Sequence, residues 1–228
     1  MTTYKVERTA ETIVASTQHV LIAGESGSGK SVLLNNIINS ILVRKWEDHA
    51  MVLIDPKKTE LFYYENTVNC AAYADEISDI ERLLERCVDL MEKRCREMKE
   101  RRERTYTGTK VHIIIDELAD LAFTSKKAMG YIQRLAQMGR AEGIQLIVAT
   151  QCPLAQVIPT RIKVNMGLRV GLHTACRQDS RNILDVAGCE ELRIGEGLLR
   201  DRDGVRKVTI RKVTEEQLNE LTGIRERA

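Results

Sequence analysis

The segment GESGSGKS at residues 24–31 constrains this 228-residue chain more than any other feature. It has the form GxxxxGK[ST], in which glycines let the backbone curl so that successive amides point at a phosphate. Apolar residues 20–23 precede it, and residues 30–45 carry apolar side chains at helical spacing, so a helix dipole would add positive charge at the loop. A strand, a glycine loop and a helix in this order predict a site for nucleotide phosphates.

The end of the glycine loop supplies the polar side chains of this predicted site. We expect Lys30 to reach the β- and γ-phosphates of ATP, and the Ser31 hydroxyl to bind Mg²⁺. The predicted nucleotide-binding residues are Gly24, Glu25, Ser26, Gly27, Ser28, Gly29, Lys30, Ser31 and Val32.

An apolar strand that ends in two acids supplies the second half of the chemistry. Residues 111–115 are mostly apolar, and Asp116 and Glu117 follow them. We expect Asp116 to hold the magnesium shell and Glu117 to polarise a water for attack on the γ-phosphate. This pair favours hydrolysis over nucleotide binding alone.

Polar residues also follow the apolar stretch 144–149. Gln151 could hydrogen-bond the γ-phosphate or the attacking water, or it could simply begin a loop. Arg134 and Arg140 are expected on the helix before this strand. If neither faces the subunit's own phosphates, one of them could reach into a neighbour's site as an arginine finger, a role that a closed ring permits.

Apolar runs alternate with helical patterns along the chain, which is typical of a mainly parallel α/β sheet flanked by helices. The length suits one domain over residues 1–228, with a core at about 19–200 and a carboxy-terminal hairpin and helix at about 197–222. Asp203 and Gly204 are the expected turn of the hairpin, and Thr214 opens the last helix. The expected strands are 19–23, 50–55, 111–115, 144–149, 168–172, 197–200 and 205–213, and the expected longer helices are 30–45 and 75–104.

Composition restricts the class of protein. Hydrophobic residues make up 43% and charged residues 30%, which is typical of a soluble globular protein. No apolar run approaches the ~20 residues of a spanning helix, and no signal peptide opens the chain, so we expect a cytoplasmic protein without a membrane segment. The six cysteines include no CxxC pair and indicate neither a zinc site nor a disulfide framework.

The net charge of the chain does not identify its binding partner. A net charge of +2 does not by itself indicate a nucleic-acid binder. Residues 93–104 are rich in Lys, Arg and Glu and too polar for a core, so we interpret them either as a solvated helix end or as a subunit or DNA contact.

With these residues assembled, the chain resembles the motor domain of the FtsK/SpoIIIE family over about residues 19–199. Besides the glycine loop and its flanks, the resemblance lies in an Ile54-Asp55-Pro56-Lys57 segment followed by Glu60-Leu61, in residues 134–153, and in residues 179–190. It departs from the family at Cys152, where arginine is usual, and at residues 194–199, which match the usual glycine-rich segment only loosely.

The resemblance implies a RecA-like P-loop fold, a homo-hexameric ring around double-stranded DNA, and translocation driven by ATP and Mg²⁺. By position, Lys30, Ser31, Asp116, Glu117 and Gln151 inherit the nucleotide roles. Arg140 is the preferred trans-acting finger and Arg134 the second choice.

The chain lacks the membrane-spanning, accessory and winged-helix regions that the family usually carries, so we expect a compact motor or an excised domain. Compact versions resemble those of conjugative elements, phages and plasmids, whose proteins are possible partners. Two rival functions remain: a conjugative coupling or secretion ATPase that moves a nucleoprotein or protein, and a regulatory nucleotide-binding module. Candidate DNA contacts, which could equally be solvated surface charges, are Lys126, Lys127, Arg161 and Lys163.

Overall fold

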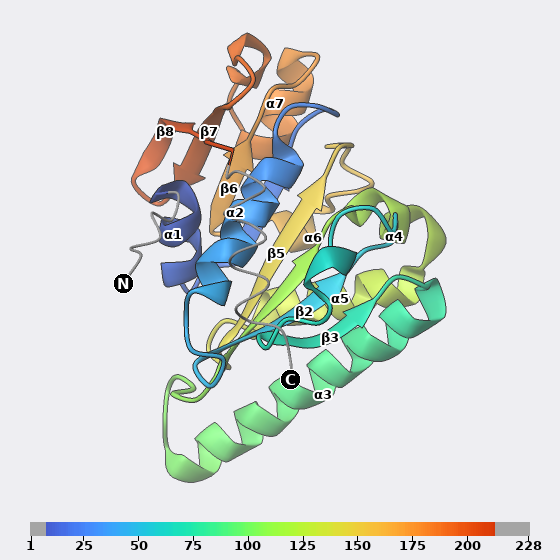
Figure 1. The fold of residues 1–228 in the computed structure, drawn as a ribbon, viewed down its shortest axis with the longest axis vertical. Helices are drawn as coiled ribbons and strands as arrows, with labels where there is room; N and C mark the ends of the chain where they lie inside the picture. Colours follow the sequence, from blue (N-terminus) through green and yellow to red (C-terminus); the bar gives the residue numbers. More distant parts are fainter. Residues whose placement is uncertain (1–7, 213–228) are drawn as a thin grey trace.

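The computed structural model describes residues 8–212, which form one eight-stranded sheet with helices on both faces (Figure 1). The strand order is β3-β2-β4-β5-β1-β6-β7-β8. The strands are β1 Val20–Ala23, β2 His49–Ile54, β3 Cys70–Ala74, β4 Lys110–Ile115, β5 Ile144–Thr150, β6 Leu168–Gly171, β7 Glu196–Asp201 and β8 Gly204–Thr209. The α-helices are α1 Arg8–Ala15, α2 Lys30–Leu42, α3 Ile77–Arg101, α4 Leu118–Thr124, α5 Lys126–Met138, α6 Thr160–Lys163 and α7 Arg177–Leu184. Two short 3-10 helices cover Phe62–Tyr64 and Cys189–Glu191.

The first six strands run parallel, and β7 and β8 complete the sheet as an antiparallel hairpin. Parallel strands place all their carboxyl ends at one edge of the sheet, where the loops that leave them meet. Strand β5 lies between β1, which leads into the glycine loop, and β4, which leads into Asp116. The carboxyl-terminal edge therefore brings together segments that are up to about 150 residues apart in the sequence.

Two hydrophobic cores cover the two faces of the sheet, because neighbouring residues of a strand point to opposite faces. In β1, Leu21 packs in the core beneath α3, α4, α5 and α7, whereas Ile22 packs in the core beneath α1 and α2. Both residues are fully buried. This burial on both faces explains the nearly unbroken apolar runs that predicted these strands.

The structure confirms the predicted fold class and hairpin, with differences at element ends. Helix α2 ends at Leu42 and α3 covers Ile77–Arg101, both shorter than expected. Strand β3 and helix α1 were not predicted, since β3 is a short edge strand of mostly small residues and α1 is only eight residues long. The helix expected from Thr214 lies outside the described residues. Among residues 8–212, no helix is long and apolar enough to cross a membrane.

The end of α3 corrects the interpretation of residues 93–104. Arg94 is only 5% exposed, and its guanidinium donates to the carbonyls of Glu142 and Thr109, each at 2.9 Å, while lying 4.1 Å from the centre of the Tyr106 ring. Met98 is buried as well. The polar run therefore contains a buried arginine that ties α3 to the loops before β4 and β5. Neither predicted alternative, a solvated end or an external contact, describes Arg94.

Candidate nucleotide site

The glycine loop leaves β1 and turns directly into α2. Gly24 is packed so closely that a Cβ there would lie 2.6 Å from the Leu172 Cβ, and Gly27 and Gly29 have φ of 78° and 101°. Glycine adopts such angles without strain, which explains their positions. The Ser28 hydroxyl is buried and has no hydrogen-bond partner within residues 8–212. Amides at the start of a 13-residue helix, with an unpartnered hydroxyl beside them, suit a phosphate.

Lys30 and Asp116 meet in the interior of this edge. The Lys30 Nζ lies 2.6 Å from the Asp116 Oδ1 and donates to the Asp116 carbonyl at 2.9 Å. Both side chains are almost fully buried. A buried ion pair is stable only while each charge keeps a partner, so these groups are suited to exchanging one charged partner for another.

Ser31 is joined to the segment that follows β2. Its hydroxyl donates to the Glu60 Oε1 at 2.7 Å. The carboxylate of Asp55, which is fully buried, accepts from the amides of Glu60 and Leu61 at 3.0 and 2.9 Å and so fixes this turn. The Ser31 hydroxyl and the carboxylates of Asp116 and Glu60 are hard oxygen donors, which suit Mg²⁺.

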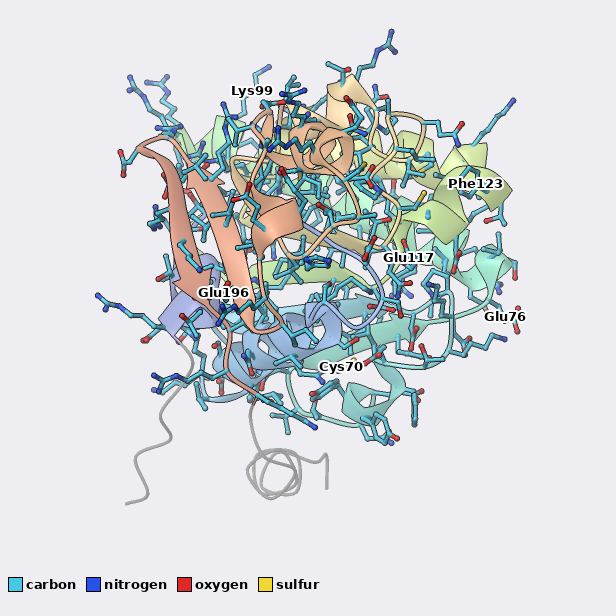
Figure 2. All side chains as sticks on the ribbon, turned by 90° about the horizontal axis from the view of Figure 1, so that it is seen from above. Cys70, Glu76, Lys99, Glu117, Phe123 and Glu196 are labelled. Carbon is cyan, nitrogen blue, oxygen red and sulfur yellow. The ribbon has the colours of Figure 1, made fainter. Side chains whose placement is uncertain are left out.

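Figure 2 looks onto this edge of the sheet and labels Glu117. Among the acids of this edge, the carboxylate of Glu117 has the most hydrogen-bond donors around it. It accepts from the Thr150 hydroxyl at 2.6 Å and from the backbone amide of Gln151 at 3.1 and 3.2 Å. It also caps the amino terminus of α4, because it accepts from the amide of Ala119 at 3.2 Å. The Lys57 Nζ lies 3.2 Å from the Glu117 Oε2. The ends of β2, β4 and β5 thus converge on one carboxylate.

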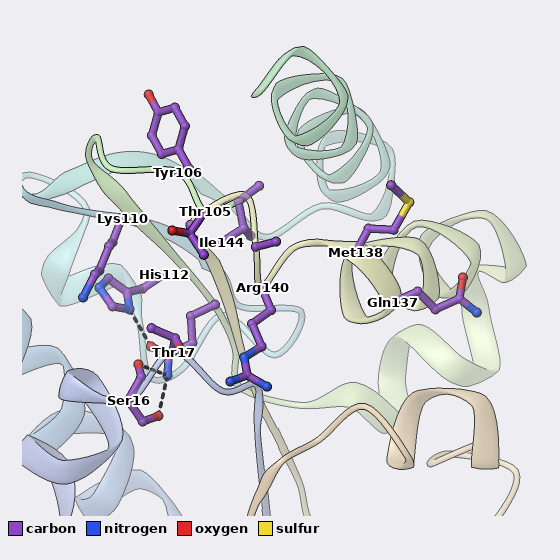
Figure 3. A pocket seen from close by; sticks show the side chains of 13 residues that line it. Ser16, Thr17, Thr105, Tyr106, Lys110, His112, Gln137, Met138, Arg140 and Ile144 are labelled. Carbon is purple, nitrogen blue, oxygen red and sulfur yellow. Dashed lines mark hydrogen bonds between the residues drawn. The ribbon is translucent and has the colours of Figure 1, made fainter. Parts of the chain in front are cut away.

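Arg140 lies at the opposite edge of the sheet, in the turn between α5 and β5 rather than on the predicted helix. The seven residues of β5, at roughly 3.3 Å each, place it about 20 Å from Gln151. It lines a cavity of about 420 Å³ together with Lys110, Tyr106 and Thr17, seen in Figure 3. In the part of the chain that the structure describes, its guanidinium forms no hydrogen bond or ion pair.

His112 and Gln145, which line the same cavity (Figure 3), belong to a chain of hydrogen-bonded polar groups that also includes the half-buried His49. His49 Nδ1 lies 2.8 Å from His112 Nε2, His112 Nδ1 lies 2.8 Å from the Gln145 Oε1, and the Gln145 amide donates to the carbonyls of Ile13 and Gln18. Burial, and then the neighbouring His49, lowers the pKa of His112 to about 3. Burial likewise lowers the pKa of His49 to about 4. These groups are therefore neutral at ordinary pH.

The family comparison supplies the remaining observation. The family description FtsK/SpoIIIE matches residues 5–112 and 107–155 of this chain. The chain belongs to the FtsK/SpoIIIE family. Membership places it among the P-loop ATPases, which hydrolyse ATP, and confirms the resemblance read from the sequence.

Full-length relatives of this FtsK/SpoIIIE chain carry named activities. DNA translocase FtsK of Oceanobacillus iheyensis is 39% identical over 201 residues, which cover 78% of this chain and 26% of that protein. DNA translocase SpoIIIE of Bacillus subtilis is 37% identical over 201 residues, covering 78% and 25%. The chain thus spans about a quarter of the length of these relatives.

Solved structures share the fold. The pCW3 conjugation coupling protein TcpA, solved as a monomer form with ATPgS, is 25% identical with a TM-score of 0.81 over 92% of this chain and 65% of that chain. The type VII secretion ATPase EccC of Thermomonospora curvata, 21% identical with a TM-score of 0.75 over 90% and 28%, supports the fold alone.

The structure brings most of the predicted site residues together, and adds others. Lys30, Ser31, Asp116, Glu117 and Gln151 meet at one edge, whereas Arg140 does not. Arg134 lies 3.6 Å from Glu92 of α3 in an exposed ion pair. Of the candidate DNA contacts, Lys127 and Lys163 pair with acids, and Lys126 and Arg161 are exposed.

Three residues of the site were not predicted from chemistry: Lys57, Glu60 and Thr150. The family resemblance included Lys57 and Glu60 but assigned no role to either. Polar residues after β2 were a usable signal, because β2 neighbours β4 and ends at the same edge.

Proposed function

We propose that this chain is the ATP-hydrolysing motor of a double-stranded DNA translocase that works as a homo-hexameric ring in the cytoplasm. The observation that carries the hydrolytic part is the Glu117 carboxylate, held at the end of β4 beside the buried Lys30–Asp116 pair. The DNA part rests on the names of the FtsK and SpoIIIE relatives.

The residues of the edge divide the work of hydrolysis. Lys30 and the loop amides bind the phosphates, and Ser31 with Asp116 would hold Mg²⁺, which neutralises phosphate charge when bound. To do so, Lys30 and Asp116 exchange their 2.6 Å contact for ligand contacts. Glu117 accepts the proton of the attacking water, and Gln151 hydrogen-bonds near the γ-phosphate.

Arg140 completes the proposal as a trans-acting residue. It lies on the edge away from its own glycine loop, it is exposed, and its guanidinium has no partner among residues 8–212. Arg134, by contrast, is engaged with Glu92. In a head-to-tail ring a residue in such a position can approach the phosphates bound by the next subunit.

A small net charge is compatible with DNA binding in a ring. Contacts to phosphates need only a few cations per subunit, because six subunits multiply them. Lys126 and Arg161, exposed on α5 and α6, are the candidates that this structure leaves most accessible.

The test is ATP turnover with and without long duplex DNA over a range of salt concentrations. We expect stimulation by duplexes of unrelated sequence that fades as salt rises, since phosphate contacts release counterions. Absence of stimulation at low salt, over several DNA lengths and protein concentrations, would contradict DNA translocation while leaving ATP hydrolysis intact.

The likeness to TcpA favours a second candidate, a conjugative coupling ATPase. Both candidates predict DNA-stimulated turnover. Displacement of a bound triplex-forming strand by the advancing protein would favour autonomous translocation, whereas stimulation without displacement would favour coupling.

A further inference from the structure

The turn after β2 places one lysine within reach of the proposed activating base. Asp55 fixes this turn by accepting from the amides of Glu60 and Leu61. From it, Lys57 extends to the Glu117 Oε2 at 3.2 Å. The lysine side chain is 33% exposed, whereas that of Glu117 is only 2% exposed. Lys57 therefore approaches the carboxylate from its solvent side.

The other donors to Glu117 are fixed parts of the sheet edge. They are the hydroxyl of Thr150, the last residue of β5, and the backbone amides of Gln151 and Ala119. All are neutral. They hold the carboxylate in place but cannot supply a compensating positive charge.

The charges around Glu117 give Lys57 a specific task. Asp116 at the end of β4 and Asp120 on α4 are both acidic, and Lys30 of α2 is committed to Asp116 at 2.6 Å. Burial, opposed most strongly by Lys57, raises the pKa of Asp120. Lys57, from the β2 turn, is thus the cation in direct contact with Glu117 among the described residues. Three donors contact the Glu117 Oε1, whereas the Oε2 is contacted by the Gln151 amide and by Lys57, which is therefore the side chain that orients the Oε2.

We propose that Lys57 is a positioning residue: its contact with the Oε2 keeps the Glu117 carboxylate aimed, so that the carboxylate can take the proton of the attacking water. The inference rests on the proposed role of Glu117 as the activating base. Lys57 itself need not touch the nucleotide in this arrangement.

The neighbouring lysine provides a matched control. Lys58 points away and pairs with Glu76 at the surface, where its side chain is 49% exposed. Replacement of either lysine by Met removes one charge from the same turn. Only Lys57→Met removes the cation beside Glu117.

We expect Lys57→Met to lower kcat by about 10- to 100-fold, with KM and nucleotide affinity within about threefold of wild type. Lys57→Arg should restore most of kcat, and Lys58→Met should leave kcat unchanged. Normal turnover in Lys57→Met, a loss confined to nucleotide affinity, or an equal loss in Lys58→Met would each overturn the inference.

A Glu117→Gln background separates this inference from the proposed function. If Glu117→Gln retains wild-type turnover, the assignment of the base fails. If Glu117→Gln is inactive and Lys57→Met is normal, only the role of Lys57 fails. In single-turnover measurements, Lys57→Met should slow the Glu117→Gln protein by less than about twofold, because the carboxylate that it acts through is gone. A full additional loss in the double variant would show that Lys57 acts elsewhere.

Discussion

The two edges of the parallel sheet use polar residues in opposite ways. At the carboxyl-terminal edge, the Lys30–Asp116 and Lys57–Glu117 contacts pair full charges near solvent-accessible loops. At the amino-terminal edge, His112 belongs to a neutral hydrogen-bonded chain. The same strands carry both sets, so the difference comes from the loops at the two ends of each strand.

This contrast separates chemistry from stability. The Lys30–Asp116 pair at the first edge can be exchanged for ligand contacts, whereas Arg94 and Gln145 at the second edge donate to backbone carbonyls and so join segments of the fold. Substitutions at the carboxyl-terminal edge should change turnover in the folded protein. Those at the amino-terminal edge should change the free energy of unfolding. Arg140 is the exception that the proposed ring predicts.

The largest effect is expected at Arg140. Its absence would contradict the proposal that this residue of the amino-terminal edge acts in hydrolysis. Arg140→Ala should fold and bind ATP normally but lose roughly 10³-fold or more in turnover, the scale of an arginine finger. An arginine in an ordinary surface salt bridge would contribute only ~0–1 kcal/mol to stability, too little to explain such a loss of turnover. Steady-state ATPase and nucleotide-binding assays measure the two quantities separately.

Mixing experiments identify which subunit Arg140 serves. An interface that pairs an intact Lys30 with a neighbour's intact Arg140 forms only when Arg140→Ala protein is mixed with Lys30→Ala protein. Some activity should therefore return in the mixture. Confirmed mixed assemblies without recovery would argue against action in trans. Near-normal turnover of Arg140→Ala alone would make Arg140 a structural residue and shift the proposal to Arg134.

The second effect concerns stability at Arg94. Arg94→Met keeps much of the side-chain volume but leaves the carbonyls of Glu142 and Thr109 without their donor, which should cost about 2 to 4 kcal/mol of unfolding free energy. Urea denaturation measures this loss. Arg96→Met, at an exposed position of the same helix, is the matched control and should change stability by less than about 0.5 kcal/mol. Equal effects at the two positions would contradict the assignment of Arg94 as a buried tie.

Sequence reasoning found the features whose signals are local. The glycine loop, the strand that ends in Asp116 and Glu117, and the hairpin at Gly204 each depend on neighbours in the chain. The polar residues after β2 are a local signal for the site, but the partner of Lys57 depends on β2 lying beside β4, a pairing between residues about 60 apart. Arg94 was misread for the same reason. A polar run in the sequence is typical of a solvated helix end. The burial of Arg94 depends on carbonyls in distant segments, which the run itself does not reveal.

The smallest effect tests the neutral chain at the amino-terminal edge through pH. If His49 Nδ1 donates to His112 Nε2, protonation of His112 Nε2 would place two N–H donors opposite each other. This cost adds to the cost of burial, which holds the pKa of His112 near 3. The unfolded chain binds this proton below pH of about 6.5 and the native state does not, so stability falls as pH drops from about 6.5 toward 3. The largest contribution of one such histidine to the slope is about 1.4 kcal/mol per pH unit.

His112→Gln should flatten the dependence of unfolding free energy on pH between about 4.5 and 6.5 by up to that amount. Urea titrations at four pH values decide the matter, and an unchanged slope in His112→Gln would show that the acid sensitivity arises elsewhere.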